Sequence, residues 1–160
     1  MRLWTIRNPK EVSILQKNGV LTTDKTYIEQ DFISAYNWMS MKLNSIDKKP
    51  SHCNYPIWAW KCYDKSRFCK PDLRLRWGTK AKEELYLIEL EIPDKKVLLS
   101  EYHLWHSVLD NNYIAYSEDD ELLCKLDKSW HGESLGDSIQ AVFWELKLEW
   151  VTKITFFKSK

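Results

Sequence analysis

The stretch RLWTIRNPKEVSILQKNG, residues 2–19, fixes the beginning of the fold. Its first part, Arg2–Ile6, alternates and is rich in β-forming residues, which predicts a strand. Asn8 then suits the N-cap of a helix, Pro9 suits the first helical position, and Glu11 stands at the capping-box position. The stretch therefore predicts a strand followed directly by a capped helix.

Three main helices are expected. The first runs from about Pro9 to Asn18, because Gly19 is a natural stop signal, and it buries Val12, Leu15 and Ile14. The second lies in residues 31–43, where apolar residues recur at helical spacing: Phe32, Ala35, Tyr36, Met39 and Leu43. The third begins with Ser100 as its N-cap and carries the apolar stripe Leu104, Trp105, Val108 and Leu109. A further short helix is expected around Leu122.

Alternating apolar runs predict further strands, in residues 55–63, 84–92 and 151–157. Pro56 should lie near the start or at the edge of its strand. Residues 138–150, SIQAVFWELKLEW, fit either a strand or a helix. The polar runs 44–54 and 64–82 predict loops.

Length and composition set the class of protein. A chain of 160 residues suits a single domain, here residues 1–160, and can bury enough apolar surface to fold. We expect an α+β fold, a single mixed domain in which a small sheet combines with about three helices. Nine tryptophans and eight tyrosines are a heavy aromatic load, whereas only four glycines and no GxGxxG or GxxxxGK[ST] pattern argue against a glycine-rich phosphate loop.

Charge and hydropathy indicate the cellular compartment of the protein and the kinds of partner it binds. The net charge is +1, which argues against nucleic-acid binding through bulk charge. A local basic run remains in residues 61–76: Lys61, Lys65, Arg67, Lys70, Arg74 and Arg76. No apolar run approaches the length of a membrane span, and the N-terminus becomes charged too soon for a secretion signal. We therefore expect a cytoplasmic protein without a membrane partner.

The four cysteines, Cys53, Cys62, Cys69 and Cys124, are expected to be reduced thiols in that compartment. Zinc binding by His52 and the first three of them would be conceivable. However, no CxxC or HxxxH pair is present and the spacing fits no standard zinc site. The sequence therefore predicts no metal site.

Trp58 and Trp60 lie two apart and would share one face of their strand. Such side chains can stack on a nucleobase or a nicotinamide ring. The simpler interpretation, which the sequence favours, is that both tryptophans fill the core.

Four polar residues are candidates for a site. Arg74, in KPDLR, could grip a phosphate or carboxylate, and Asp72 could orient that arginine or accept a hydrogen bond from a ribose hydroxyl; an ordinary loop ion pair is the alternative. Glu145 lies between two apolar residues and would be costly to bury unless it is paired or functional. The alternative interpretation is that Glu145 faces solvent from an amphipathic element. Gln140 also lies among apolar residues, but burying its neutral amide would cost less free energy than burying a carboxylate.

Four stretches together carry a resemblance: RLWTI, YPIWAW with KPDLR, EIPDKKVLLSEYHLWHSVLDN, and SIQAVFWELKLEWV. They resemble a bacterial family, domain of unknown function 3841, over essentially the whole chain. The family label implies no particular activity.

The order of elements also looks like that of the ADP-ribosyltransferase superfamily, especially the DarT-like toxins. This resemblance implies an ADP-ribosyltransferase-like fold, with NAD as a possible substrate and Trp58 and Arg74 beside it. Trp4 and Thr5 occupy the first strand, where the superfamily usually has His or Arg. The resemblance puts the catalytic glutamate near residues Gln140 to Val142, where this chain has no acid, and Glu145 is the nearest one.

Three functions stay open at this point. The first is an ADP-ribosyltransferase-like domain that binds NAD or a related nucleotide through Trp58, Arg74 and Gln140, with Glu145 as its acid. The second is a non-enzymatic module that binds nucleic acid or protein through the basic and aromatic segment 61–77. The third is an accessory protein without a small-molecule ligand.

Overall fold

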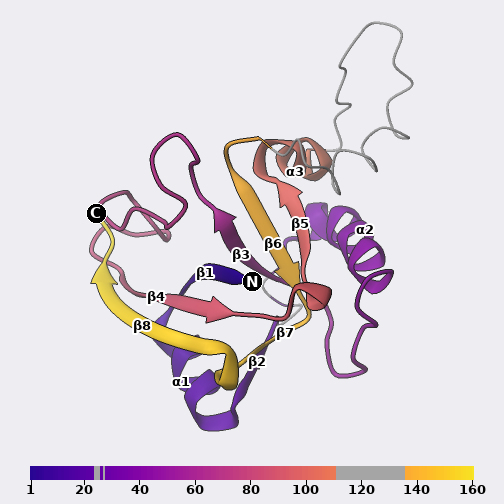
Figure 1. The fold of residues 1–160 in the computed structure, drawn as a ribbon, viewed down its shortest axis with the longest axis horizontal. Coiled ribbons are helices and arrows are strands. Elements are labelled where there is room, and N and C mark those ends of the chain that lie inside the picture. Colours follow the sequence, from indigo (N-terminus) through magenta and orange to yellow (C-terminus); the bar gives the residue numbers. More distant parts are fainter. Residues whose placement is uncertain (24–25, 27, 111–135) are drawn as a thin grey trace, which may run out of the picture.

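The computed structural model describes residues 1–23, 26, 28–110 and 136–160. Its centre is a six-stranded antiparallel sheet in the order β5-β6-β3-β1-β4-β8, accompanied by a two-stranded sheet, β2-β7 (Figure 1). The strands are β1 Arg2–Arg7, β2 Val20–Thr22, β3 Ile57–Cys62, β4 Glu84–Glu91, β5 Leu98–Glu101, β6 Ile139–Phe143, β7 Glu145–Lys147 and β8 Val151–Lys158. The helices are α1 Pro9–Asn18, α2 Ile33–Asn44 and α3 Tyr102–Leu109, with 3-10 turns at Gln30–Phe32, Asp94–Lys96 and Leu148–Trp150. The predicted α+β class is confirmed.

The opening strand–helix unit forms as its sequence predicts. The Asn8 side chain accepts a hydrogen bond from the backbone N–H of Glu11 (2.9 Å), and the Glu11 carboxylate accepts one from the backbone N–H of Asn8 (3.1 Å). Gly19 ends α1 in the left-handed region, at φ 74°, which a glycine adopts without steric cost.

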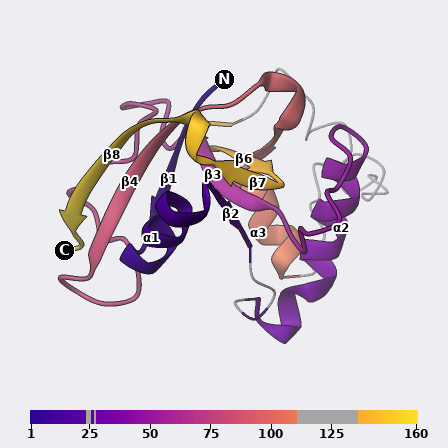
Figure 2. The same cartoon turned by 90° about the horizontal axis from the view of Figure 1, so that it is seen from below.

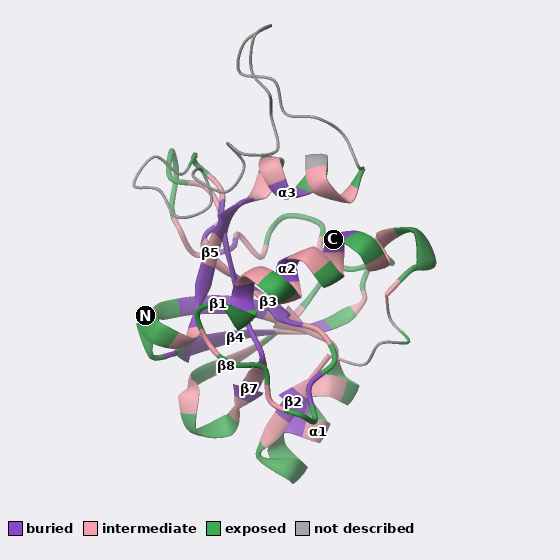
Figure 3. Ribbon diagram, turned by 90° about the vertical axis from the view of Figure 1, so that its right-hand side faces the viewer, coloured by how far each residue is buried: buried purple, intermediate pink, exposed green. Residues whose placement is uncertain are grey.

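Two hydrophobic clusters lie on opposite faces of the main sheet. Neighbouring residues of β3 divide between them: Ala59 joins the cluster beneath α1 and β2, and Trp58 packs against the cluster under α2 and α3. Successive side chains of a strand point to opposite faces, so this division is what a sheet covered on both sides requires. Figure 2 shows α2 and α3 together and away from α1, and Figure 3 shows the buried residues gathered on the strands.

The region around Ser100 differs from the prediction. Ser100 is not an N-cap: it lies inside β5, which pairs with β6 from Leu98↔Val142 to Glu101↔Ile139. The cap of α3 is Glu101, whose carboxylate accepts a hydrogen bond from the backbone N–H of Leu104 (2.8 Å). Pairing with a distant strand decides this boundary, and the local sequence does not contain that information.

The ambiguous segment 138–150 forms strands β6 and β7 followed by a 3-10 turn, so its strand interpretation is confirmed. The closing strand, β8, is confirmed as well. The short helix predicted around Leu122 lies outside the described residues. None of the described helices is long and apolar enough to cross a membrane.

The expectation of reduced thiols is wrong for two cysteines, because Cys62 and Cys69 form a disulfide. The chain turns back between them, and the backbone N–H of Tyr63 donates to the carbonyl of Cys69 (2.8 Å). Spacing alone does not reveal this turn. Cys53 is a buried free thiol, and Cys124 lies outside the described residues.

The pairing of β1 is uneven on its two sides. β1 pairs with β4 along its whole length, from Arg2↔Glu91 to Arg7↔Tyr86, but its pairing with β3 is limited to Trp4↔Trp60. Beyond that pair β1 and β3 diverge, and the resulting gap positions the candidate site.

Candidate functional site

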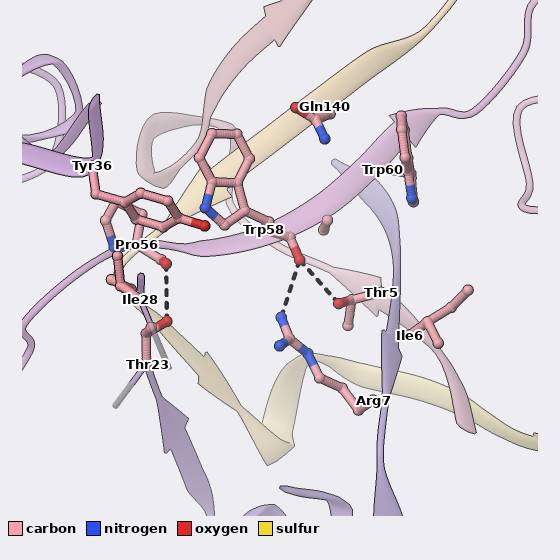
Figure 4. Close-up of a pocket in the computed structure, with 11 residues that line it drawn as sticks. Thr5, Ile6, Arg7, Thr23, Ile28, Tyr36, Pro56, Trp58, Trp60 and Gln140 are labelled. Atoms are coloured by element: carbon pink, nitrogen blue, oxygen red, sulfur yellow. Dashed lines mark hydrogen bonds between the residues drawn. The ribbon is translucent and has the colours of Figure 1, made fainter. Parts of the chain in front are cut away.

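A cavity of about 290 Å³ lies where β1 and β3 diverge. We call it the β1–β3 pocket. Most of the polar and aromatic side chains that line it come from four elements (Figure 4): Thr5 and Arg7 from β1, Tyr36 from α2, Trp58 and Trp60 from β3, and Gln140 from β6. Thr23, just after β2, adds a hydroxyl.

Side chains replace the missing backbone ladder between the diverging strands. The backbone carbonyl of Trp58 accepts hydrogen bonds from the Thr5 hydroxyl (3.0 Å) and from Nη2 of Arg7 (3.1 Å). Nη1 of Arg7 also donates to the carboxylate of Glu11 (3.1 Å), the residue that closes the capping box of α1. The guanidinium is therefore oriented by both β3 and α1.

Aromatic rings form two walls of the pocket. The Trp58 ring lies 6.1 Å from that of Tyr36 and 4.5 Å from that of Trp105, between centroids. The Trp60 ring lies 5.2 Å from that of Tyr102. Both tryptophans are only half-buried. Trp58 packs against the cluster under α2 and α3, as expected of a core residue, whereas Trp60 belongs to neither cluster. The expectation that both fill the core therefore holds only for Trp58, and both side chains also line the pocket.

Three residues of the pocket carry a buried polar atom that has no hydrogen-bond partner in the described part of the chain: Arg7 Nε, Trp58 Nε1 and Gln140 Oε1. An unsatisfied buried polar group costs about 1–3 kcal/mol. Gln140 is 9% exposed, and Figure 4 shows its amide directed into the space between Trp58 and Trp60. Such a group calls for an explanation, and a hydrogen bond to a bound ligand or water would supply one.

The protonation state of Tyr36 is also shaped by this environment. Burial raises the pKa of the Tyr36 phenol, and the positive charge of Arg7 partly offsets that rise. The phenol is therefore neutral at physiological pH and can donate a hydrogen bond.

A second cavity, of about 480 Å³, adjoins the first. The two share Arg7 and Thr23, so the arginine stands at their common wall. The second cavity also has Lys10, Glu11 and His52 in its lining.

The comparisons with known proteins give one match. The family model described as domain of unknown function (DUF3841) matches residues 2–132. The chain belongs to this family. No curated protein and no solved structure gives a significant match.

The structure of this DUF3841 chain brings together Thr5, Trp58 and Gln140 of the predicted site residues, all in the β1–β3 pocket. Trp4 lies outside it: the side chain is buried, and the guanidinium of Arg2 lies 5.4 Å from its ring centroid. Glu145 lies outside it as well, with a carboxylate oxygen 2.9 Å from Nε2 of His52.

Asp72 and Arg74 also lie away from the pocket lining, in the loop between β3 and β4. The Arg74 guanidinium binds the Asp72 carboxylate through Nε (2.9 Å) and Nη2 (2.8 Å), and the arginine side chain is 76% exposed. These hydrogen bonds from Arg74 hold the pKa of Asp72 at about 2. The predicted contact between Asp72 and Arg74 is therefore present. Because the guanidinium already donates two hydrogen bonds to Asp72, it is not free to bind a ligand in the same way.

Sequence reasoning missed Arg7 and Tyr36. The predicted strand ended at Ile6, one residue short of Arg7. A period of two from Thr5 would have placed Arg7 on the same side of the strand. Tyr36 was assigned only to the apolar face of its helix, and no local signal marks it as a pocket residue.

The basic segment 61–77 carries much of its charge in ion pairs. Lys70 binds Glu89 of β4 (2.6 Å), Arg74 binds Asp72, and Arg67 lies 3.8 Å from Asp64. Glu89 also accepts a hydrogen bond from Arg2 (2.6 Å) and is 3% exposed. Glu89 therefore anchors this loop to the sheet.

The ion pairs of Glu89 with Lys70 and Arg2 should make the free energy of unfolding depend on pH. Hydrogen bonds from Lys70 and then Arg2 lower the pKa of Glu89 from 4.5 to about 2. A depressed native pKa stabilises the fold above the unfolded-state value and loses its effect as the pH falls. We expect the free energy of unfolding to drop between about pH 4.5 and 2 by on the order of 2 kcal/mol from this group, after screening of the exposed partners.

Urea denaturation across that pH range measures the effect. In Glu89→Gln the drop should be smaller by the same amount. An exposed control, Glu84→Gln, should keep the wild-type pH dependence, because Glu84 is half-exposed and paired only with Lys158 among the described residues. Equal pH dependence in wild type and Glu89→Gln would contradict the assignment.

Proposed function

We propose that the β1–β3 pocket binds a nucleotide, and that NAD is the first candidate. The observation that carries the proposal is the convergence of aromatic rings and unpartnered buried polar atoms in one cavity. Trp58 and Trp60 offer π-faces to a planar heterocycle, an interaction worth about 1–3 kcal/mol per base. Gln140 and Tyr36 offer hydrogen bonds to its edge or to a ribose.

A dinucleotide suits the two adjoining cavities better than a single base does. Arg7 stands at their common wall, where the diphosphate of a ligand that spans both would lie. Its guanidinium is held by the carbonyl of Trp58 and the carboxylate of Glu11, so little conformational entropy is lost when an anion binds, but the anion shares the arginine with Glu11. Lys10 adds positive charge to the second cavity.

The resemblance to ADP-ribosyltransferases suggests which reaction the pocket would catalyse, the cleavage of NAD between nicotinamide and ribose. In such a reaction the bond between nicotinamide and ribose C1′ breaks, and nicotinamide leaves with the electron pair. Positive charge develops on the ribose until water or another acceptor adds there and loses a proton. A carboxylate beside the ribose stabilises that charge. Gln140 stands near the place where the resemblance puts this acid, and a neutral amide offers much less stabilisation.

We therefore infer a protein that binds NAD and turns it over slowly at most. Glu145 is unsuited to supply the acid from its present place, because its carboxylate pairs with His52 and Lys147 outside the pocket. The alternative function, nucleic-acid or protein binding through segment 61–77, is less favoured. Acidic side chains already neutralise Arg67, Lys70 and Arg74 of that segment.

Replacing Gln140 by methionine separates binding from folding. Methionine has a similar length and no polar atom to leave unsatisfied. The free energy of unfolding should be unchanged or up to about 1 kcal/mol higher, because a buried orphan acceptor is removed. The affinity for NAD should fall about tenfold, because a ligand hydrogen bond is lost. Isothermal titration calorimetry and urea denaturation measure the two effects.

Arg74→Ala is the matched control, since the sequence nominates Arg74 as the anion grip while the structure places it in an exposed loop. We expect wild-type NAD affinity in this variant. Weaker binding in Arg74→Ala with normal binding in Gln140→Met would move the site to the loop. Absence of any heat or thermal shift with NAD, ADP-ribose or ADP would refute nucleotide binding altogether.

A second variant, Gln140→Glu, tests the chemistry. A carboxylate at this position should raise the rate of nicotinamide release from NAD at least about tenfold, because it stabilises the developing ribose charge. Chromatographic detection of nicotinamide measures the rate, and Glu145→Gln serves as the comparison. If Gln140→Glu binds NAD normally yet releases no nicotinamide above the wild-type rate, the pocket is a binding site without transferase geometry.

A further inference from the structure

His52, Cys53 and Glu145 bring three different potential metal ligands together. One ligand atom from each lies within 4.8 Å of the other two. Nε2 of His52 is 2.9 Å from Oε2 of Glu145, and Cys53 is 2% exposed. The sequence makes His52 and Cys53 conceivable zinc ligands together with Cys62 and Cys69, but this set is rejected there because the spacing fits no standard site. Glu145, 93 residues from His52, was not considered as a ligand.

The loop that carries His52 and Cys53 is held firmly on the side of β7. The indole N–H of Trp144 donates to the carbonyl of Asp47 (2.7 Å), and the backbone N–H of Cys53 donates to the carbonyl of Pro50 (3.1 Å). Glu145 opens β7, where it pairs with Thr22. The fold thus places the three residues side by side before any metal arrives.

The two oxygens of Glu145 have different surroundings. Oε1 lies 3.4 Å from Nζ of Lys147, and Oε2 faces His52. One oxygen is therefore available beside the imidazole while the other keeps its cationic partner. His52 also belongs to the lining of the second cavity, so its side chain can be reached from that cavity.

We propose that His52, Cys53 and Glu145 bind one zinc ion, with the fourth coordination position open for water or another exchangeable ligand. Zinc bond lengths and tetrahedral angles put ligand atoms about 3.3–3.6 Å apart, which small side-chain rotations reach from the present separations. Thiolate and imidazole ligands select zinc over magnesium or calcium. Thiolate and carboxylate together also neutralise the dication.

The Cys53 thiol must lose its proton to bind a metal ion. Burial, and then the negative charge of Glu145, raise the pKa of the Cys53 thiol to about 11. A dication at the same place would reverse the second effect and deprotonate the thiol on binding. None of the three residues lines the β1–β3 pocket, and His52 alone lines the second cavity, so the zinc proposal is tested with the metal alone and without NAD.

Cobalt(II) is the direct probe, because a thiolate ligand gives it a charge-transfer absorption in the near ultraviolet. We expect chelator-treated full-length protein, kept without reductant so that the Cys62–Cys69 disulfide stays closed, to bind one Co²⁺ per chain with this absorption. Zinc should displace it. The charge-transfer absorption should vanish in Cys53→Ser, and zinc affinity, measured by chelator competition, should fall at least tenfold in His52→Ala and in Glu145→Gln.

Cys124→Ser is the thiol control and should retain the absorption. His52 is more than half exposed, so His52→Ala should fold even if Cys53→Ser does not. An absorption that persists in Cys53→Ser, or wild-type zinc affinity in His52→Ala, would overturn the proposal. So would absence of the absorption in the wild type, which would leave an ordinary histidine–carboxylate pair beside a neutral thiol.

Discussion

The backbone carbonyl of Trp58 is the point on which the candidate site depends. Two neighbouring strands of an antiparallel sheet normally close against each other through their backbone groups. Here β1 and β3 part after Trp4↔Trp60, and the carbonyl of Trp58 is satisfied by the side chains of Thr5 and Arg7 instead. The strands remain joined, yet a cavity opens between them without an orphaned carbonyl, which would be costly to bury.

The same contact links the site to the most local feature of the sequence. Glu11 closes the capping box of α1 and also binds Arg7. The start of the helix thereby fixes the guanidinium at the wall shared by the two cavities. Aromatic rings from β3 and α2 and the amide of Gln140 from β6 complete the lining of the pocket for which we propose a nucleotide ligand.

Sequence reasoning succeeded where the information is local. The Asn8–Glu11 capping box and Gly19 set both ends of α1, and alternation set β3, β4 and β8. It failed where a distant partner decides: Ser100 belongs to a strand because β6 lies beside it, and Cys62 meets Cys69 because the loop turns back. Three predicted site residues, Thr5, Trp58 and Gln140, line the same pocket. Arg7 joins them there because β1 and β3 separate after one residue pair, and the sequence of neither strand alone predicts that separation.

The most direct test of the account follows the indole N–H signals of the nine tryptophans by ¹H–¹⁵N NMR while NAD is added. Trp58→Phe and Trp60→Phe assign the two pocket signals. The account predicts that the signals of Trp58 and Trp60 shift with a common, saturable dependence on NAD concentration while that of Trp150, outside the pocket lining, stays in place. Saturable shifts confined to indoles other than Trp58 and Trp60, or no shifts at all, would contradict it.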